Sequence, residues 1–209
     1  GGAASVMFKV MNQDPVPPSQ VAEAGRAAGY DAIIAKALAR EAGLWNLFLP
    51  GLLEDEPGTR LGHLDYAPLA ETMGRLPWAA EVFNCSAPDT GNMELLHRFA
   101  TPEQRVQWLM PLLEGRIRSA FAMSEPDVAS SDPTNLQTTV RREGAELVLN
   151  GRKWFITGVA HPNCRVLIVM ARNEGQDSED PHHRHSMVLL PMGTPGLETV
   201  RNIPVVHHH

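Results

Sequence analysis

The residues best suited to chemistry lie between 121 and 132, where an apolar run gives way to hydroxyl and acidic side chains. Phe121–Ser124 predicts a strand that is broken at Pro126, because proline lacks a backbone N–H. The loop after it offers N–H groups and hydroxyls, which can bind phosphate oxygens or the edge of a planar heterocycle. Serine-rich turns are common without any ligand, so a β-turn capped by Ser130, Ser131 and Asp132 is the structural alternative.

A second such stretch is Lys153–Gly158. It follows Asn150-Gly151, the dipeptide typical of a type I′ turn, so Leu147–Leu149 and Trp154–Ile156 are predicted to form a β-hairpin. Side chains alternate between the two faces of a strand. One of the two aromatic residues in this stretch is therefore expected to face a core whatever the function is.

These two stretches resemble segments of acyl-CoA dehydrogenases. The first matches the family signature of a hydroxyl residue, Glu-Pro and a small-residue loop that closes with Ser-Asp. Three further segments also resemble family segments and occur in the expected order along the chain. They are His97–Gln104, Leu112–Gly115 and Leu149–Lys153. The loop is one residue longer than the commonest family form and has Ser130 where glycine is usual, as in a longer-loop branch of the family. Serine restricts this backbone to conformations that do not require glycine.

The resemblance implies FAD as the cofactor and places its contacts in both stretches. The implied cofactor-binding residues are Phe121, Met123, Ser124, Ser130, Ser131, Phe155, Ile156 and Thr157. Ser124 would offer its hydroxyl and N–H to the N5/O4 edge of the flavin, where a donor stabilises developing negative charge. Ser131 would contact both the cofactor and the acyl-CoA substrate. Phe155 stands where the family commonly has tryptophan.

No residue of the chain is expected to be the catalytic base. The family's motif glutamate does not have that role, so Glu125 is expected to be a structural hydrogen-bond acceptor. Lys153 is expected to organise the local backbone or the solvent face. In the family the base lies in a C-terminal helical bundle, and nothing after Val206 resembles it. The fragment alone is therefore expected to be inactive.

For the parent protein, the resemblance implies FAD-dependent α,β-dehydrogenation of acyl-CoA thioesters. An acyl-CoA oxidase or flavin monooxygenase on the same fold, or a non-catalytic fragment, are the alternatives. The implied partners are acyl-CoA, an electron acceptor such as an electron-transfer flavoprotein, and further copies of the chain in a homo-oligomer. The implied location is the bacterial cytoplasm or the mitochondrial matrix.

Composition is that of a globular protein with an acidic balance. Of 209 residues, 18 are Lys or Arg and 24 are Asp or Glu, which gives a formal net charge of −6. This balance argues against nucleic-acid or membrane-surface binding. No run approaches the roughly 18 apolar residues of a membrane span. The two cysteines, Cys85 and Cys164, are isolated and typical of a reducing compartment.

Histidines cluster in two places. His182, His183 and His185 lie in a charged stretch that predicts a surface loop, with a metal site as the alternative. His207, His208 and His209 are either native or a tag remnant.

Hydrophobic periodicity changes along the chain and predicts an α+β fold. An N-terminal all-helical domain is expected over 1–116, and an antiparallel β-barrel or sandwich domain over 117–209, without the C-terminal helical bundle. The segment Thr101–Gln104 predicts a helix start with a capping box, and Gly115 the end of that helix. Further expected elements are a helix near 32–38, a buried apolar loop over 44–51, a helix over 66–73, strands at 136–142, 166–170, 187–190 and 196–200, and a turn at 143–144.

Overall fold

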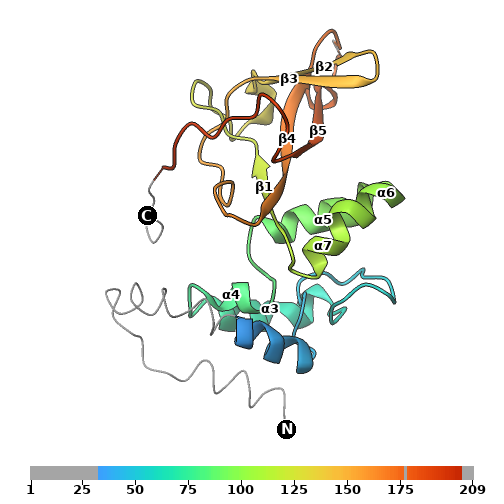
Figure 1. Ribbon diagram of the computed structural model, residues 1–209, viewed down its shortest axis with the longest axis vertical. Helices are drawn as coiled ribbons and strands as arrows, with labels where there is room; N and C mark the ends of the chain where they lie inside the picture. Colours follow the sequence, from blue (N-terminus) through green and yellow to red (C-terminus); the bar gives the residue numbers. More distant parts are fainter. Residues whose placement is uncertain (1–32, 177, 204–209) are drawn as a thin grey trace. The chain divides into compact units, whose positions relative to one another are not determined.

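The computed structural model describes residues 33–176 and 178–203, so the three terminal histidines lie outside the described residues. The chain divides into two compact units between Gly115 and Arg116. The described part of the first unit is helical and the second holds a five-stranded sheet, so the α+β prediction is confirmed (Figure 1). Each unit is described by itself.

Helices make up the first unit. Residues 33–41 are helical. The elements that follow are α3 (His63–Met73), α4 (Ala79–Val82), α5 (Asp89–Phe99), α6 (Pro102–Gln104), the π-helical η1 (Arg105–Leu109) and α7 (Met110–Leu113). The predicted helix over 66–73 is confirmed as part of α3, which ends at Met73 with Gly74 as its C-cap.

The helix start at Thr101 is confirmed in detail. Thr101 Oγ1 accepts a hydrogen bond from the Gln104 N–H at 3.3 Å, and Gln104 Oε1 accepts one from the Thr101 N–H at 3.0 Å. The helical stretch that follows is not uniformly α-helical, because η1 widens to a π-turn just before Pro111. Proline has no N–H to donate to the preceding turn, which favours such an irregularity.

The apolar loop over 44–51 is buried, as its composition predicts. Trp45, Leu47 and Leu49 are among the core residues of the first unit. The Trp45 indole N–H donates to the carbonyl oxygen of Leu113 at 2.7 Å, and Asn46 Nδ2 donates to the same oxygen at 2.8 Å. The loop therefore satisfies the open carbonyl end of α7 as well as filling the core.

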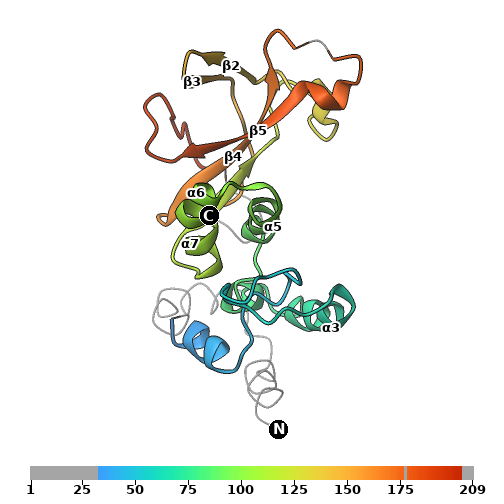
Figure 2. The ribbon, with the colours of Figure 1, turned by 90° about the vertical axis from the view of Figure 1, so that its right-hand side faces the viewer.

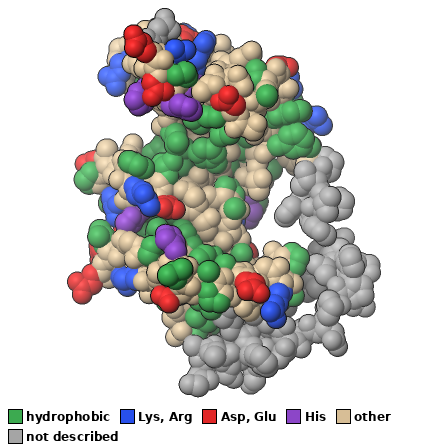
Figure 3. Space-filling view, turned by 180° about the vertical axis from the view of Figure 1, so that it is seen from behind, with side chains coloured by type: hydrophobic (Ala, Val, Ile, Leu, Met, Phe, Trp, Pro, Cys, Tyr) green, Lys and Arg blue, Asp and Glu red, His purple; other side chains and the backbone are tan. Residues whose placement is uncertain are grey.

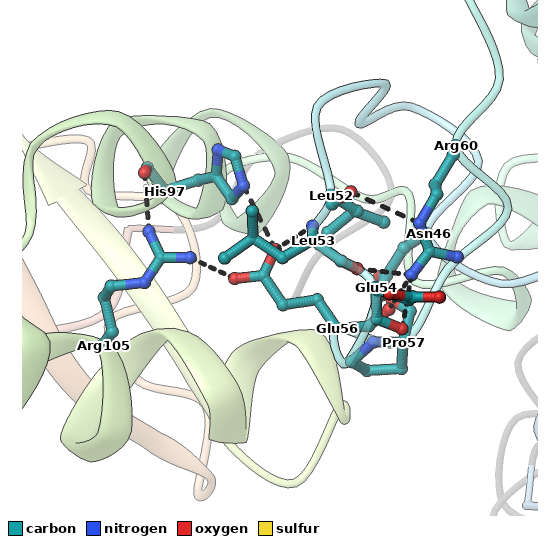
Figure 4. Close-up of polar contacts among 9 residues, drawn as sticks. All are labelled: Asn46, Leu52, Leu53, Glu54, Glu56, Pro57, Arg60, His97 and Arg105. Atoms are coloured by element: carbon teal, nitrogen blue, oxygen red, sulfur yellow. Dashed lines mark hydrogen bonds and ion pairs between the residues drawn. The ribbon is translucent and has the colours of Figure 1, made fainter.

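A buried carboxylate fixes the next loop (Figure 4). Glu56 forms an ion pair with Arg105, lies 3.1 Å from His97 Nε2 and accepts a hydrogen bond from the Leu53 N–H at 2.8 Å. Arg105 Nη1 in turn donates to the His97 carbonyl oxygen at 2.7 Å. The Arg60 guanidinium donates hydrogen bonds to several carbonyl oxygens of the same loop. Charge pairing thus holds a segment that has no regular secondary structure.

The second unit contains β1 (Arg118–Ala122), β2 (Thr139–Glu143), β3 (Glu146–Asn150), β4 (Cys164–Asn173) and β5 (His185–Pro191). The central strand is β4, which pairs in parallel with β1 and β2 and antiparallel with β5 (Figure 2). The sheet is therefore mixed, and the antiparallel prediction is wrong. The long segment from 123 to 163 gives the chain room to return and enter β4 parallel to β1.

Strand predictions elsewhere in this unit have mixed outcomes. The turn at Gly144 joins β2 and β3, as predicted, with a φ of 62°. The predicted hairpin at Asn150-Gly151 is wrong, since no strand lies between β3 and β4 among the described residues. Phe155 has a φ of 51°, in the left-handed region, which a strand does not accommodate. The predicted strand at 196–200 is also irregular.

Both faces of β4 are buried, and one core cluster of this unit lies on the face of β1 and β4 that carries Leu167 and Val169. Ala120 and Ala122 of β1 pack with Cys164, Leu167 and Val169 of β4. The charged β2–β3 hairpin is solvent-exposed over Arg141–Glu143, and charged side chains gather at that end of the unit on the face drawn in Figure 3. Ala122, the last residue of β1, pairs with Val169 of β4, and the chain continues from there into the candidate site.

Candidate cofactor site in the sheet unit

Two segments far apart in the sequence meet just beyond the end of β1. The Trp154 N–H donates to the Ser124 carbonyl oxygen at 3.0 Å. Lys153 Nζ lies 2.8 Å from the Met123 carbonyl oxygen and 2.8 Å from Glu125 Oε1. The two stretches that the sequence singled out are therefore neighbours in the fold.

Glu125 is the centre of this junction. Its Oε2 accepts a hydrogen bond from the Gln137 N–H at 2.7 Å, and its Oε1 accepts one from the Thr138 N–H at 2.9 Å in addition to the Lys153 contact. The side chain is only 4% exposed. The expectation that Glu125 is a structural hydrogen-bond acceptor is confirmed.

The protonation of Glu125 follows from these contacts. Burial opposes ionisation, but the hydrogen bonds from Lys153, Thr138 and Gln137 outweigh it and lower the pKa of Glu125 from 4.5 to about 2. Burial also lowers the pKa of Lys153, while Glu125 favours its charged form. At neutral pH the carboxylate is ionised and already has donors on both oxygens, so it is poorly suited to accept a substrate proton.

The candidate hydroxyls divide into two groups. Ser130 Oγ accepts a hydrogen bond from the Glu125 N–H at 2.9 Å and donates within its own loop, 3.2 Å from the Val128 carbonyl oxygen. The side chains of Ser124, Ser131 and Thr157 have no hydrogen-bond partner within residues 33–176 and 178–203. These three hydroxyls therefore remain available to a ligand, whereas that of Ser130 closes the loop.

The two aromatic residues form an exposed pair. The Trp154 and Phe155 ring centroids are 4.7 Å apart with an interplanar angle of 55°. The two residues are 38% and 52% exposed, so the expectation that one of them faces a core is wrong. The left-handed φ of Phe155 breaks the alternation on which that expectation depended. Ile156, next in the chain, does pack against the sheet core.

Phe121 and Met123 follow strand alternation. Ala120 and Ala122 face the sheet core, so Phe121 at the intervening position points to the other face. Both Phe121 and Met123 are half-buried. The sheet unit thus combines apolar side chains with unpartnered hydroxyls near one junction, a donor set that suits a flat heterocycle with a polar edge.

The sequence did not predict that Gly151 packs closely against Thr138. A Cβ on Gly151 would lie 2.3 Å from Thr138 Oγ1 and 2.7 Å from Thr138 Cα. Glycine is needed here for close approach of two backbone segments rather than for a hairpin turn. The same Asn-Gly signal fits both roles, so only the three-dimensional contact distinguishes them.

The histidine cluster, the cysteines and the described helices show no further candidate site among the described residues. His182 and His183 are exposed, and no cluster of three potential metal ligands occurs in the described part of the chain. Cys85 and Cys164 are both buried. None of the described helices is long and apolar enough to span a membrane.

Comparison with known proteins gives a consistent result. Residues 11–116 match the family model "Acyl-CoA dehydrogenase, N-terminal domain", and residues 120–206 match "Acyl-CoA dehydrogenase, middle domain". "Probable acyl-CoA dehydrogenase FadE2" of Mycobacterium tuberculosis is 54% identical over 171 residues, which cover 81% of this chain and 40% of that protein. The chain therefore spans less than half the length of this relative.

Two solved structures also resemble this chain. A solved structure from Mycobacterium abscessus has 48% sequence identity and a TM-score of 0.78, covering 97% of this chain and 46% of that one. The structure of PigA with FAD and proline has 26% identity and a TM-score of 0.68, covering 97% and 50% of the two chains.

Proposed function

The chain belongs to the acyl-CoA dehydrogenase family, and we propose that the whole protein uses FAD to dehydrogenate acyl-CoA thioesters between the α and β carbons. In this proposal residues 1–116 form the N-terminal domain and 117–209 the middle domain. The observation that carries it is the junction of Ser124 with Trp154, which brings the two implied flavin-binding stretches together.

The junction residues suit FAD by their chemistry. The Ser124 and Thr157 hydroxyls are available as donors to the polar edge of the flavin, and Phe121, Met123 and Phe155 provide apolar contact. PigA, which has a similar fold, binds FAD. When bound, FAD supplies the hydride acceptor of the reaction.

Four residues of the candidate site have separate parts in this proposal. Ser124 orients its hydroxyl toward developing negative charge, and preorganised donors of this kind lower the barrier. Phe155, whose ring is exposed, would provide an apolar contact to the flavin when it is bound. Ser131 lies on the exposed side of the loop, where it is available to both cofactor and acyl-CoA. Ser130, also expected to bind the cofactor, instead keeps the loop closed.

Proton abstraction is not assigned to this chain. Glu125 has the right functional group, but its pKa of about 2 and its existing hydrogen bonds make it a weak base. We assign removal of the α-proton to a carboxylate outside these residues. The proposal also includes an external electron acceptor, homo-oligomeric assembly and a location in the bacterial cytoplasm or mitochondrial matrix, and family membership supports these parts.

Flavin spectroscopy of the whole protein tests this function. The purified protein should be yellow or become so with FAD, and straight-chain acyl-CoA should bleach the flavin band under anaerobic conditions. Oxygen should then restore the band slowly. A protein that cannot be loaded with FAD would contradict the proposal, and rapid reoxidation with release of peroxide would indicate an oxidase instead.

A further inference from the structure

Lys153 connects the two candidate flavin-binding stretches through its side chain. Its ammonium group donates to the Met123 carbonyl oxygen and to Glu125 Oε1, each at 2.8 Å. The next residue, Trp154, donates its N–H to the Ser124 carbonyl oxygen at 3.0 Å. Two consecutive residues on one segment thus bind three consecutive residues on the other.

The environment of Lys153 is that of an internal anchor. The side chain is 11% exposed, and the carboxylate it contacts is more deeply buried. Glu125 is itself fixed by the N–H groups of Gln137 and Thr138. An ammonium held between a fixed carboxylate and a fixed carbonyl has little freedom, because moving it leaves buried charge without a partner.

Ser124 lies between the two residues that the ammonium holds. Its carbonyl is tied to Trp154, while its hydroxyl has no partner among the described residues. The position of that hydroxyl therefore depends on a backbone fixed on both sides. By contrast, neighbouring Arg152 is exposed and has no such contacts with residues 123–125 in the described structure.

We propose that Lys153 is a positioning residue for flavin binding: its ammonium group holds Met123 and Glu125 so that the Ser124 hydroxyl and the Trp154–Thr157 segment face one ligand. This inference rests on the proposed FAD function. Lys153 acts through the backbone of these segments and needs no contact of its own with the cofactor.

The test compares Lys153→Met with Arg152→Met in the whole protein. Both variants remove one positive charge, but only the first removes the two anchoring hydrogen bonds. Lys153→Met is expected to weaken the FAD Kd at least tenfold and to change the visible circular dichroism of bound flavin. Arg152→Met should keep the Kd within twofold and the spectrum unchanged. Wild-type values for both properties in Lys153→Met would overturn the proposal.

Hydrogen exchange in the FAD-free protein provides a readout that is independent of the cofactor. The Trp154 amide should exchange at least tenfold faster in folded Lys153→Met than in wild type, since its acceptor is no longer held in place. An unchanged rate would contradict the positioning role even if FAD did not bind. Failure of the wild-type protein to bind FAD, with faster exchange in the variant, would instead contradict only the proposed function.

Glu125→Gln carries the test if Lys153→Met does not fold. The amide keeps an oxygen acceptor for the ammonium but removes the negative charge and the acceptor of the Gln137 N–H, so the anchor is weakened rather than deleted. We expect the FAD Kd to weaken about threefold and the Trp154 amide to exchange faster. If both properties stay at wild-type values, the proposal is wrong.

Discussion

The main-chain N–H of Trp154 and the carbonyl oxygen of Ser124 are joined by a 3.0 Å hydrogen bond across 30 positions of sequence (154 − 124 = 30). This bond holds the exposed Trp154–Phe155 pair close to Ser124, which follows β1. The Ser124 hydroxyl has no hydrogen-bond partner among the described residues. The Lys153–Glu125 ion pair lies directly beside it. The candidate site is thus a junction of two backbone segments, and the predictions below separate its binding groups from its supports.

Ser124→Ala tests the hydroxyl at this junction. Removing one preorganised donor to developing charge typically slows the chemical step by about 10²-fold. We therefore expect Ser124→Ala to slow flavin reduction by acyl-CoA by that factor in the whole protein. Stopped-flow absorbance measures the rate, with Ser178→Ala in the loop before β5 as the control. A reduction rate equal to wild type would remove Ser124 from the proposed role.

Phe155 allows binding and stability to be separated. Its φ of 51° is unfavourable for a residue with a Cβ, and its side chain is 52% exposed. Phe155→Gly should therefore be more stable than Phe155→Ala, by on the order of 1 kcal/mol. Both variants should retain FAD less well than wild type. Urea unfolding and FAD release check this, and an alanine variant more stable than the glycine variant would disagree with the backbone geometry.

Acid stability should depend on Glu125. Its pKa in the folded chain is about 2, below its ordinary 4.5, so its ionised form favours folding above about pH 4.5. That contribution is lost as the pH falls from about 4.5 toward 2. The difference in unfolding free energy between wild type and Glu125→Gln should shrink over this interval. Urea titrations at several pH values measure the difference, and a constant gap down to pH 2 would contradict the assigned pKa.

Arg105 and Arg98 provide a comparison in the helical unit. Arg105 pairs with Glu56, whose side chain is 2% exposed, whereas the Arg98–Glu94 pair lies on the surface of α5. Arg105→Met should lower the unfolding free energy by on the order of 3 kcal/mol, because it leaves a buried carboxylate short of a partner. Arg98→Met should cost less than about 1 kcal/mol. Similar losses in both variants would be evidence against burial as the cause.

Local sequence signals predicted several elements well. The Thr101 capping box and the Gly144 turn each depend on residues within a few positions of one another. The strand predicted over Phe121–Ser124 is only partly confirmed, because β1 begins at Arg118 and ends at Ala122. The structural part of Glu125 also agrees with expectation, although its donors at 137 and 138 were not foreseen. Motifs that carry their own geometry could therefore be recognised directly.

Features that depend on contacts between distant segments could not be predicted from local sequence signals. Parallel pairing of β1 with β4 joins segments separated by the whole β2–β3 hairpin, and no local pattern specifies it. Asn150-Gly151 has the composition of a hairpin turn, but the glycine is required by its close approach to Thr138. The left-handed conformation of Phe155 likewise runs against its residue type. Tertiary contacts determine all three features.

The central claim is that the Ser124 and Trp154–Thr157 segments bind the same FAD molecule. Hydrogen exchange of the whole protein, measured while FAD is titrated, tests it most directly. Amides at 121–124 and at 155–157 should both become protected, with one shared apparent Kd. Protection of only one segment, or protection of the two with different Kd values, would contradict a common flavin site.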